Sequence, residues 1–180
     1  MTRIAIAAVV AVSTMAGVGC SVAADDETAD EVRRISADVA READRAEISA
    51  LMWRYVRALD SRDPDAYAAA YTEDGQFAAG GNVTKGRDAL RQMVADLRQR
   101  AAEAEAKGGA QPAMYHMTMN EHLEFVDADH ARMHAYWQTV FGAAGQTPVR
   151  VAAAGRSVDE IVRVNGQWLI QSRNVAPTGE

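Results

Sequence analysis

Apolar and polar residues alternate with two different periods along this chain, and the period changes near residue 109. Before that point apolar residues recur every three or four positions, which predicts helices. After it they alternate with polar residues, which predicts strands with one buried face. Helices followed by a run of strands indicate an α+β domain.

Three helices are expected before the change of period. The first carries an apolar stripe from Ile48 to Leu59 and ends at Asp60. The second begins at Pro64, since proline suits the first helical position after a capping residue. Lys107-Gly108-Gly109 ends the third. The predicted segments are 46–60, 64–71 and 87–106, with a short strand at 76–79.

Four long strands are expected after residue 109, at 114–126, 131–141, 149–164 and 167–175. The last two are joined by Asn165-Gly166, a strong hairpin signal because both central residues of a type I′ turn need positive φ. Strands joined by such short turns pair in antiparallel fashion.

The first 24 residues read as a signal peptide. Arg3 precedes an apolar stretch, Ile4 to Val12, that is too short to span a bilayer. The single cysteine, Cys20, follows small residues and resembles the acylation site of a bacterial lipoprotein. The sequence therefore predicts export, as a periplasmic or membrane-anchored lipoprotein, with ordinary secretion as the alternative.

Composition supports one globular domain after that segment. Hydrophobic residues make up 48% of the chain and charged residues 24%, which is ordinary for a folded protein. The net charge of -6, with arginines interspersed among acids, argues against nucleic acid as a partner. Residues 25–45 read as an acidic tether or helix, and residues 46–176 as the domain.

His116 and Asp60 are the leading candidates for chemistry. Asp60 lies at the end of the apolar stripe, where a carboxylate is poorly placed for the helix dipole. A neutral imidazole, with an ordinary pKa near ~6.5, is a usable base at neutral pH. A carboxylate on its other ring nitrogen would fix the tautomer and stabilise the imidazolium, so the pair could act as a general base.

These residues also carry a family resemblance. Asp60, His116 with Asn120, the run 123–126, and the segment 155–168 resemble the SnoaL-like members of the NTF2-like superfamily. The site resembles those of hexachlorocyclohexane dehydrochlorinase and scytalone dehydratase. The resemblance implies a cone, in which three N-terminal helices pack on a strongly curved, mixed, mainly antiparallel sheet around a cavity.

Further site residues come from the same resemblance. Arg173 falls where the dehydrochlorinase has a functional arginine, although arginine there also suits a solvated edge. Tyr55 stands where that enzyme has a lysine, and Ser157 where an aromatic residue is usual. His134 would match a second pocket histidine of scytalone dehydratase. Asp60, His116, Arg173 and Tyr55 are thus the expected catalytic residues, and Asn120, His134 and Ser157 the expected binding residues.

Two functions remain open at this stage. The first is a lyase or isomerase, needing no cofactor or metal, that acts on a small hydrophobic molecule. The second is a non-catalytic ligand-binding or scaffold domain. The resemblance also implies a homodimer, with Met117, Leu123 and Val140 as candidates for an apolar outer face of the sheet.

Overall fold

The computed structural model describes residues 21–109, 112–142 and 149–178. Most of the predicted signal peptide, including Cys20, lies outside these ranges. The chain divides into two compact units, Met1–Arg41 and Glu42–Glu180. A single helix, α1 (Ser21–Asp60), passes from the first unit into the second.

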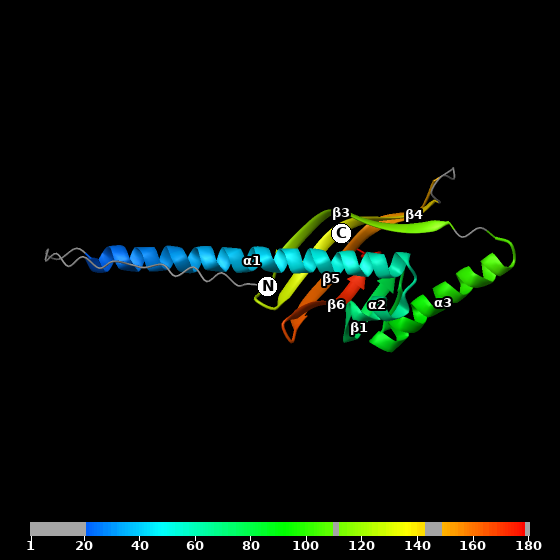
Figure 1. Ribbon diagram of the computed structural model, residues 1–180, viewed down its shortest axis with the longest axis horizontal. Helices are drawn as coiled ribbons and strands as arrows, with labels where there is room; N and C mark the ends of the chain where they lie inside the picture. Colours follow the sequence, from blue (N-terminus) through cyan, green and yellow to red (C-terminus); the bar gives the residue numbers. More distant parts are fainter. Residues whose placement is uncertain (1–20, 110–111, 143–148, 179–180) are drawn as a thin grey trace, which may run out of the picture. The chain divides into compact units, whose positions relative to one another are not determined.

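In the second unit all three helices precede the four long strands, as the change of period predicts (Figure 1). After α1 come α2 (Pro64–Ala69), β1 (Tyr71–Ala79), β2 (Asn82–Lys85), α3 (Arg87–Ala106), β3 (Ala113–Phe125), β4 (His130–Gly142), β5 (Arg150–Val164) and β6 (Gln167–Asn174). The sequence pattern missed β2. It also extended the second helix to Tyr71, which is instead the first residue of β1.

The strands form one six-stranded sheet in the order β2-β1-β6-β5-β4-β3. All neighbouring pairs are antiparallel except β1 and β6, which run parallel. The sheet is therefore mixed and mostly antiparallel, as the family resemblance implies. Alternation alone predicted only its antiparallel part, because the β1–β6 pairing joins segments about a hundred residues apart.

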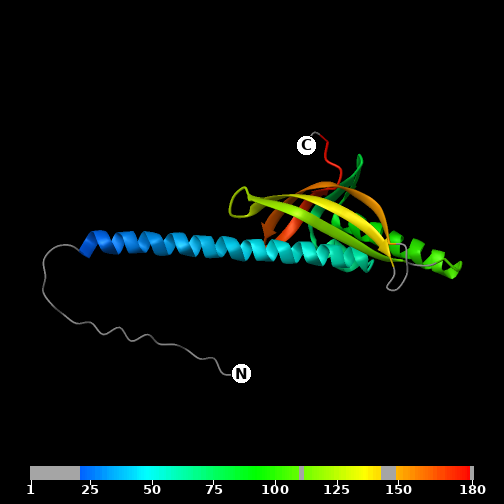
Figure 2. The same ribbon diagram turned by 90° about the horizontal axis from the view of Figure 1, so that it is seen from above.

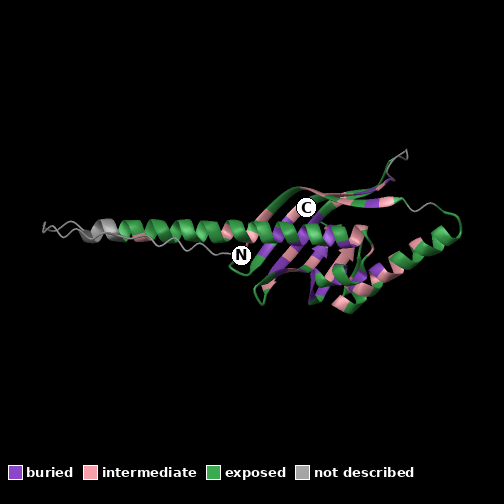
Figure 3. Ribbon diagram, viewed as in Figure 1, coloured by how far each residue is buried: buried purple, intermediate pink, exposed green. Residues whose placement is uncertain are grey.

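The core of the second unit lies between its helices and the sheet (Figures 2 and 3). Alpha helix α1 contributes its predicted stripe, including Ile48, Leu51 and Tyr55. Strands β5 and β6 contribute Ile161 and Ile170, both fully buried. The stripe at helical spacing and the alternation at strand spacing thus face each other, which is why the chain adopts a two-layer arrangement.

The described part of the first unit is the N-terminal portion of α1, which is exposed almost throughout (Figure 3). Its apolar residues Val32, Ile35 and Val39 are all more than half exposed. Ion pairs three residues apart, such as Arg33 with Asp30, support the helix locally.

Two local signals are confirmed. Asp63 caps α2, since its carboxylate accepts hydrogen bonds from the backbone N–H groups of Asp65 and Ala66 at 3.1 and 3.0 Å. Asn165 and Gly166 have φ values of 51° and 78°, as a type I′ hairpin requires.

A β-bulge in β3 changes which side chains face the core. The pairing of β3 with β4 shifts register between Met119 and His122, and Asn120 in between has a φ of 52°. An extra residue moves the following side chains to the opposite face. Leu123 therefore packs against the core, and its expected place on the outer face was wrong.

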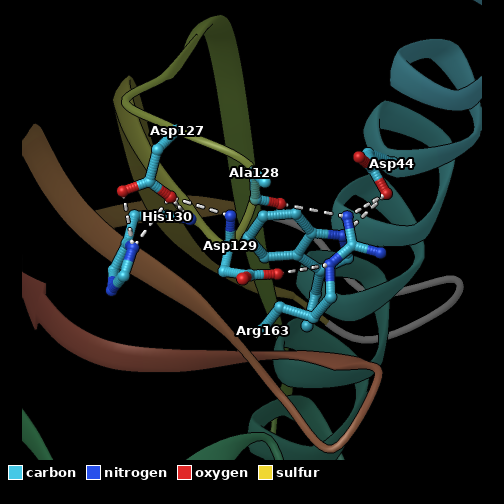
Figure 4. A network of polar contacts seen from close by, with 7 residues as sticks. Asp44, Asp127, Ala128, Asp129, His130 and Arg163 are labelled. Atoms are coloured by element: carbon cyan, nitrogen blue, oxygen red, sulfur yellow. Dashed lines mark hydrogen bonds and ion pairs between the residues drawn. The ribbon is translucent and has the colours of Figure 1, made fainter. Parts of the chain in front are cut away.

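A group of polar residues, the Asp44 cluster, joins α1 to the sheet within the second unit (Figure 4). The Asp44 carboxylate accepts hydrogen bonds from Arg163 Nη2 at 2.5 Å and from the Trp168 indole N–H at 3.2 Å. The Arg163 guanidinium also stacks 4.5 Å from the Trp168 ring centre and reaches Asp129 in the β3–β4 turn. The cluster thus fixes α1 against β5 and β6 upstream of the site.

Candidate functional site

Asp60 and His116 are in direct contact. His116 Nδ1 lies 2.8 Å from Asp60 Oδ1, and the His116 backbone N–H donates to the same oxygen at 2.9 Å. The two side chains are only 21% and 10% exposed. The carboxylate therefore orients both the backbone and the ring of this histidine.

The fold explains why this contact forms. Asp60 is the last residue of α1, and His116 is on β3, a strand at one edge of the sheet. An edge strand leaves backbone N–H groups without a partner strand, and the Asp60 carboxylate accepts one of them. A carboxylate at the C-terminal end of a helix, where the dipole disfavours it, is thereby stabilised by two hydrogen bonds.

When the His116 ring is neutral, its contact with Asp60 places the proton on Nδ1. An ionised carboxylate only accepts hydrogen bonds, so Nδ1 is the donor when the ring is neutral. Nε2, the nitrogen that Asp60 does not contact, then carries the lone pair. This is the tautomer needed to accept a proton from a ligand, and the carboxylate stabilises the imidazolium that results.

His116 lines a cavity of about 170 Å³ between α1 and the sheet. An engineered apolar cavity of about 150 Å³ holds benzene, so a volume of this order suits a molecule of similar size. Its walls are largely apolar and come from α1 and from or next to every strand except β2. The other lining residues are Tyr55, Val56, Leu59, Phe77, Met117, Thr118, Trp137, Thr139, Ala153, Arg173 and Val175. Thr139 is the cross-strand neighbour of His116.

A second hollow also includes His116 in its lining. It measures about 410 Å³, runs along α1 and β3, and shares Val56, His116, Met117 and Thr118 with the cavity. The histidine therefore contributes to the linings of both the cavity and this more open groove.

Arg173 is buried at the cavity and is not on a solvated edge. It is 3% exposed and forms an ion pair with its cross-strand neighbour Asp159, which is fully buried. Its guanidinium carbon lies 4.8 Å from the centre of the Tyr55 ring, an arrangement that favours a cation. One nitrogen, Nε, is buried without a hydrogen-bond partner in the described part of the chain.

The charges of this pair depend on its burial. Burial lowers the pKa of Arg173, but Asp159 and the tyrosines Tyr55 and Tyr71 together raise it above its ordinary value. Burial also raises the pKa of Asp159, to about 6, against the opposing effects of Arg173 and Ser157. At neutral pH the pair is thus a guanidinium beside a carboxylate.

Tyr55 is one of three packed tyrosines. Its ring centre lies 5.3 Å from that of Tyr67 and 6.1 Å from that of Tyr71. The hydroxyls of Tyr67 and Tyr71 are 3.1 Å apart. Burial, followed by the neighbouring tyrosines, raises the pKa of both Tyr67 and Tyr71 well above its ordinary value, so these hydroxyls stay protonated.

The three residues expected to bind a ligand lie outside the cavity lining. Ser157 is buried, and its hydroxyl donates a hydrogen bond to the Asp159 carboxylate at 3.4 Å, so it stabilises the carboxylate that pairs with Arg173. Asn120 is exposed in the β3 bulge, where its positive φ is a backbone role. The His134 ring lies 6.4 Å from that of His122, on the same stretch of β3 and β4.

Sequence reasoning missed two important residues. Trp137 lines the cavity, and its indole N–H is within 3.0 Å of the backbone oxygens of both Arg156 and Val175. Gly155 makes room for it, because a Cβ at that position would lie 2.9 Å from the Trp137 ring. Asp159 was missed as well. Its signal was an acid at an inward position of a strand, two residues after Ser157.

Comparison with known proteins identifies the family. Residues 40–174 match the SnoaL-like domain. The chain belongs to the SnoaL-like family. Among curated proteins, none matches the chain.

Solved structures share the fold of this SnoaL-like protein. The chain is 27% identical to Rv3472 of Mycobacterium tuberculosis, a protein of unknown function, over 75% of this chain and 72% of that one, with a TM-score of 0.59. An NTF2-like protein with a cystatin-like fold from Novosphingobium aromaticivorans has 23% identity, coverages of 80% and 88%, and a TM-score of 0.65. A candidate scytalone dehydratase from the same organism has 21% identity, coverages of 78% and 96%, and a TM-score of 0.60.

Two features are absent from the described ranges. No helix there is long and apolar enough to cross a membrane. No three His, Cys, Asp or Glu side chains in these ranges gather closely enough to hold a metal ion.

Proposed function

We propose that this SnoaL-like protein is a lyase or isomerase that uses His116 and Asp60 to remove a proton from carbon in a small hydrophobic molecule. The observation that carries the proposal is the 2.8 Å contact between His116 Nδ1 and Asp60 Oδ1 beside a largely apolar cavity. Phe77 and Trp137 in the walls favour a flat organic ligand. The reaction requires no cofactor in this scheme.

The proposed step is a simple proton transfer. A ligand C–H loses its proton to His116 Nε2, and Asp60 stabilises the imidazolium. The electron pair left on carbon either expels a group from the neighbouring atom, giving a double bond, or forms an enolate that is reprotonated elsewhere. Arg173, with Tyr55 next to it, stabilises the negative charge that develops on the ligand oxygen or departing group.

The family's cone geometry fits this scheme. In the proposal the sheet curves around the ligand, and the groove along α1 and β3 gives access to His116 from the surface. A largely apolar enclosure strengthens the electrostatic effect of Arg173 because fewer waters compete with it.

The test needs one ligand and four variants. Neutral organic molecules of about ten heavy atoms are screened for a rise in melting temperature, and those that bind are assayed for turnover. His116→Ala should reduce turnover by about 10²–10⁴-fold, the usual contribution of a general base. Asp60→Asn keeps the shape but not the preferred tautomer, so it should lose activity too, and the double variant should lose little more than the worse single variant.

The matched control is His122→Ala. His122 is on the same strand but is exposed and pairs with Glu124, outside the cavity. It should turn over substrate like the wild type. Wild-type turnover by His116→Ala would reject the proposed mechanism.

A non-catalytic ligand-binding domain is the second candidate. It is favoured by the Asp159 carboxylate, which already neutralises the Arg173 guanidinium before any ligand charge develops. In this case the screened molecules would bind to the wild type, and neither the wild type nor His116→Ala would convert any of them.

We further propose that the protein is exported and anchored through an acylated Cys20. The apolar N-terminal stretch, the small residues before the lone cysteine and the acidic segment after it support this. Mass spectrometry of the mature N-terminus tests it. A lipid-free terminus at Ala24 or Asp25 would indicate ordinary secretion instead.

A homodimer is also proposed, through the outer face of the sheet. Tyr115 and Tyr136 are 44% and 51% exposed on neighbouring strands and would supply apolar contact area. Light scattering after size-exclusion chromatography should give twice the chain mass.

A further inference from the structure

Asp159 is a buried acid that the proposed reaction does not use. It is fully buried beside Ser157 and forms an ion pair with Arg173, yet it is absent from the cavity lining. Desolvating a carboxylate in such a place is costly, and replacing a buried ion pair by apolar residues is often neutral or stabilising. Stability alone is therefore a weak reason for its presence.

The charges around the cavity show what Asp159 changes. Arg173 is the only cation that lines the cavity among the described residues, and Asp159 neutralises it. At the other end Asp60 is a carboxylate whose partner His116 is a neutral base in the proposed mechanism. Neither carboxylate lines the cavity, but each contacts a residue that does, so a ligand there meets the field of two carboxylates and one guanidinium.

An anionic ligand would meet an unfavourable field in this cavity. Its charge would be attracted by Arg173 but repelled by both carboxylates, in a largely apolar space where such interactions are strong. An uncharged ligand with a carbonyl oxygen avoids that repulsion. It could still accept a hydrogen bond from the guanidinium of Arg173, which lines the cavity.

We propose that Asp159 sets the charge preference of this cavity, so that it selects an uncharged ligand over an anion of the same shape. The inference rests on the proposed function in placing the ligand between His116 and Arg173. It makes Asp159 a specificity-determining residue that acts through Arg173. Specificity of this kind comes from rejecting the wrong ligand as well as from binding the right one.

The test compares benzamide with benzoate, which share one shape and differ in charge. Affinities are measured by isothermal titration calorimetry at pH 8, above the pKa of Asp159 of about 6, so that its carboxylate is ionised. The wild type should bind benzamide at least tenfold more tightly than benzoate. A tenfold affinity ratio corresponds to a difference of about 1.4 kcal/mol in binding free energy, which is less than the repulsion expected from one nearby like charge.

Asp159→Asn should shift this ratio toward benzoate by at least tenfold, because it removes a carboxylate and leaves Arg173 free to bind an anion. Glu160→Gln is the matched control. It removes the same charge one residue along β5, where Glu160 pairs with Arg132 at 2.7 Å and is partly exposed. Its benzamide-to-benzoate ratio should equal that of the wild type.

Three results would overturn the inference: equal wild-type affinity for both probes, an unchanged ratio in Asp159→Asn, or binding of neither probe by either protein. The wild-type comparison stands even where Asp159→Asn does not fold. Because the readout is equilibrium binding, it separates the two proposals. If the protein prefers benzamide but converts no substrate, only the proposed mechanism is rejected. If it converts an anionic substrate and does not bind the uncharged molecule of the same shape, only the inference about Asp159 is rejected.

Discussion

Replacing Arg173 with methionine should destabilise the protein strongly and in a pH-dependent way. The substitution keeps most of the side-chain volume but leaves the fully buried Asp159 without its countercharge. Removing one partner of a buried ion pair costs on the order of 3–5 kcal/mol. We expect a loss in this range at pH 8.

The pH dependence follows from the direction of the Asp159 pKa. Burial holds this pKa at about 6, above the value of roughly 3.9 for an unfolded aspartate, and Arg173 is the largest influence that lowers it. A carboxyl whose pKa is raised in the folded state binds its proton more tightly there than in the unfolded state. It therefore destabilises the fold at a pH above the folded-state pKa, and it has no such effect at a pH below both the folded and the unfolded pKa. Without Arg173 the pKa should rise further, and protonation at pH 5 should relieve most of the loss.

The measurement is urea unfolding of wild type and Arg173→Met at pH 5 and pH 8. Arg132→Met is the control, because it removes an arginine from the Arg132–Glu160 pair, whose side chains are 45% and 38% exposed. Exposed pairs contribute about 1 kcal/mol or less, so the control should lose little, and equally at both pH values. An equal loss for Arg173→Met at pH 5 and pH 8 would refute the assignment of a buried, titrating Asp159.

Three further variants test the packing. Gly155→Ala places a methyl group 2.9 Å from the Trp137 ring, and we expect a loss of about 1–3 kcal/mol with a shifted tryptophan emission spectrum; an unchanged melting temperature would contradict this. Asp44→Ala removes the acceptor of Arg163 in the Asp44 cluster, and urea unfolding should show a loss of about 1–3 kcal/mol. Gly166→Ala puts a side chain at a φ of 78°, and thermal unfolding should show a loss of about 1–2 kcal/mol if the hairpin keeps its turn.

The local elements of this fold could be predicted from the sequence because their causes are local. The spacing of Ile48, Leu51 and Tyr55 predicts one buried helix face, and the Asn165-Gly166 pair predicts a tight hairpin. A bulge is harder to see, since it depends on how two strands pair. The sequence prediction did not include the register shift at Asn120, so it assigned Leu123 to the outer face of the sheet instead of the core.

The candidate dyad was predicted in part by physical reasoning and in part by family resemblance. Asp60 at a helix end and His116 on a strand are fifty-six residues apart, and no local pattern brings them together. Their contact depends on α1 lying along the edge strand β3, whose open backbone N–H the carboxylate also accepts.

Residue types on the chain determined the buried helix stripe, the alternating strands and the turns, because periodicity and backbone preference act over a few neighbours. Only the tertiary structure decided that Arg173 and Asp159 form a buried pair, that Gly155 admits Trp137, and that the cavity has one neutralised cation at its wall. These features require side chains from separate strands to meet in a space that excludes water. Burial then determines their charge, and burial is a property of the whole fold.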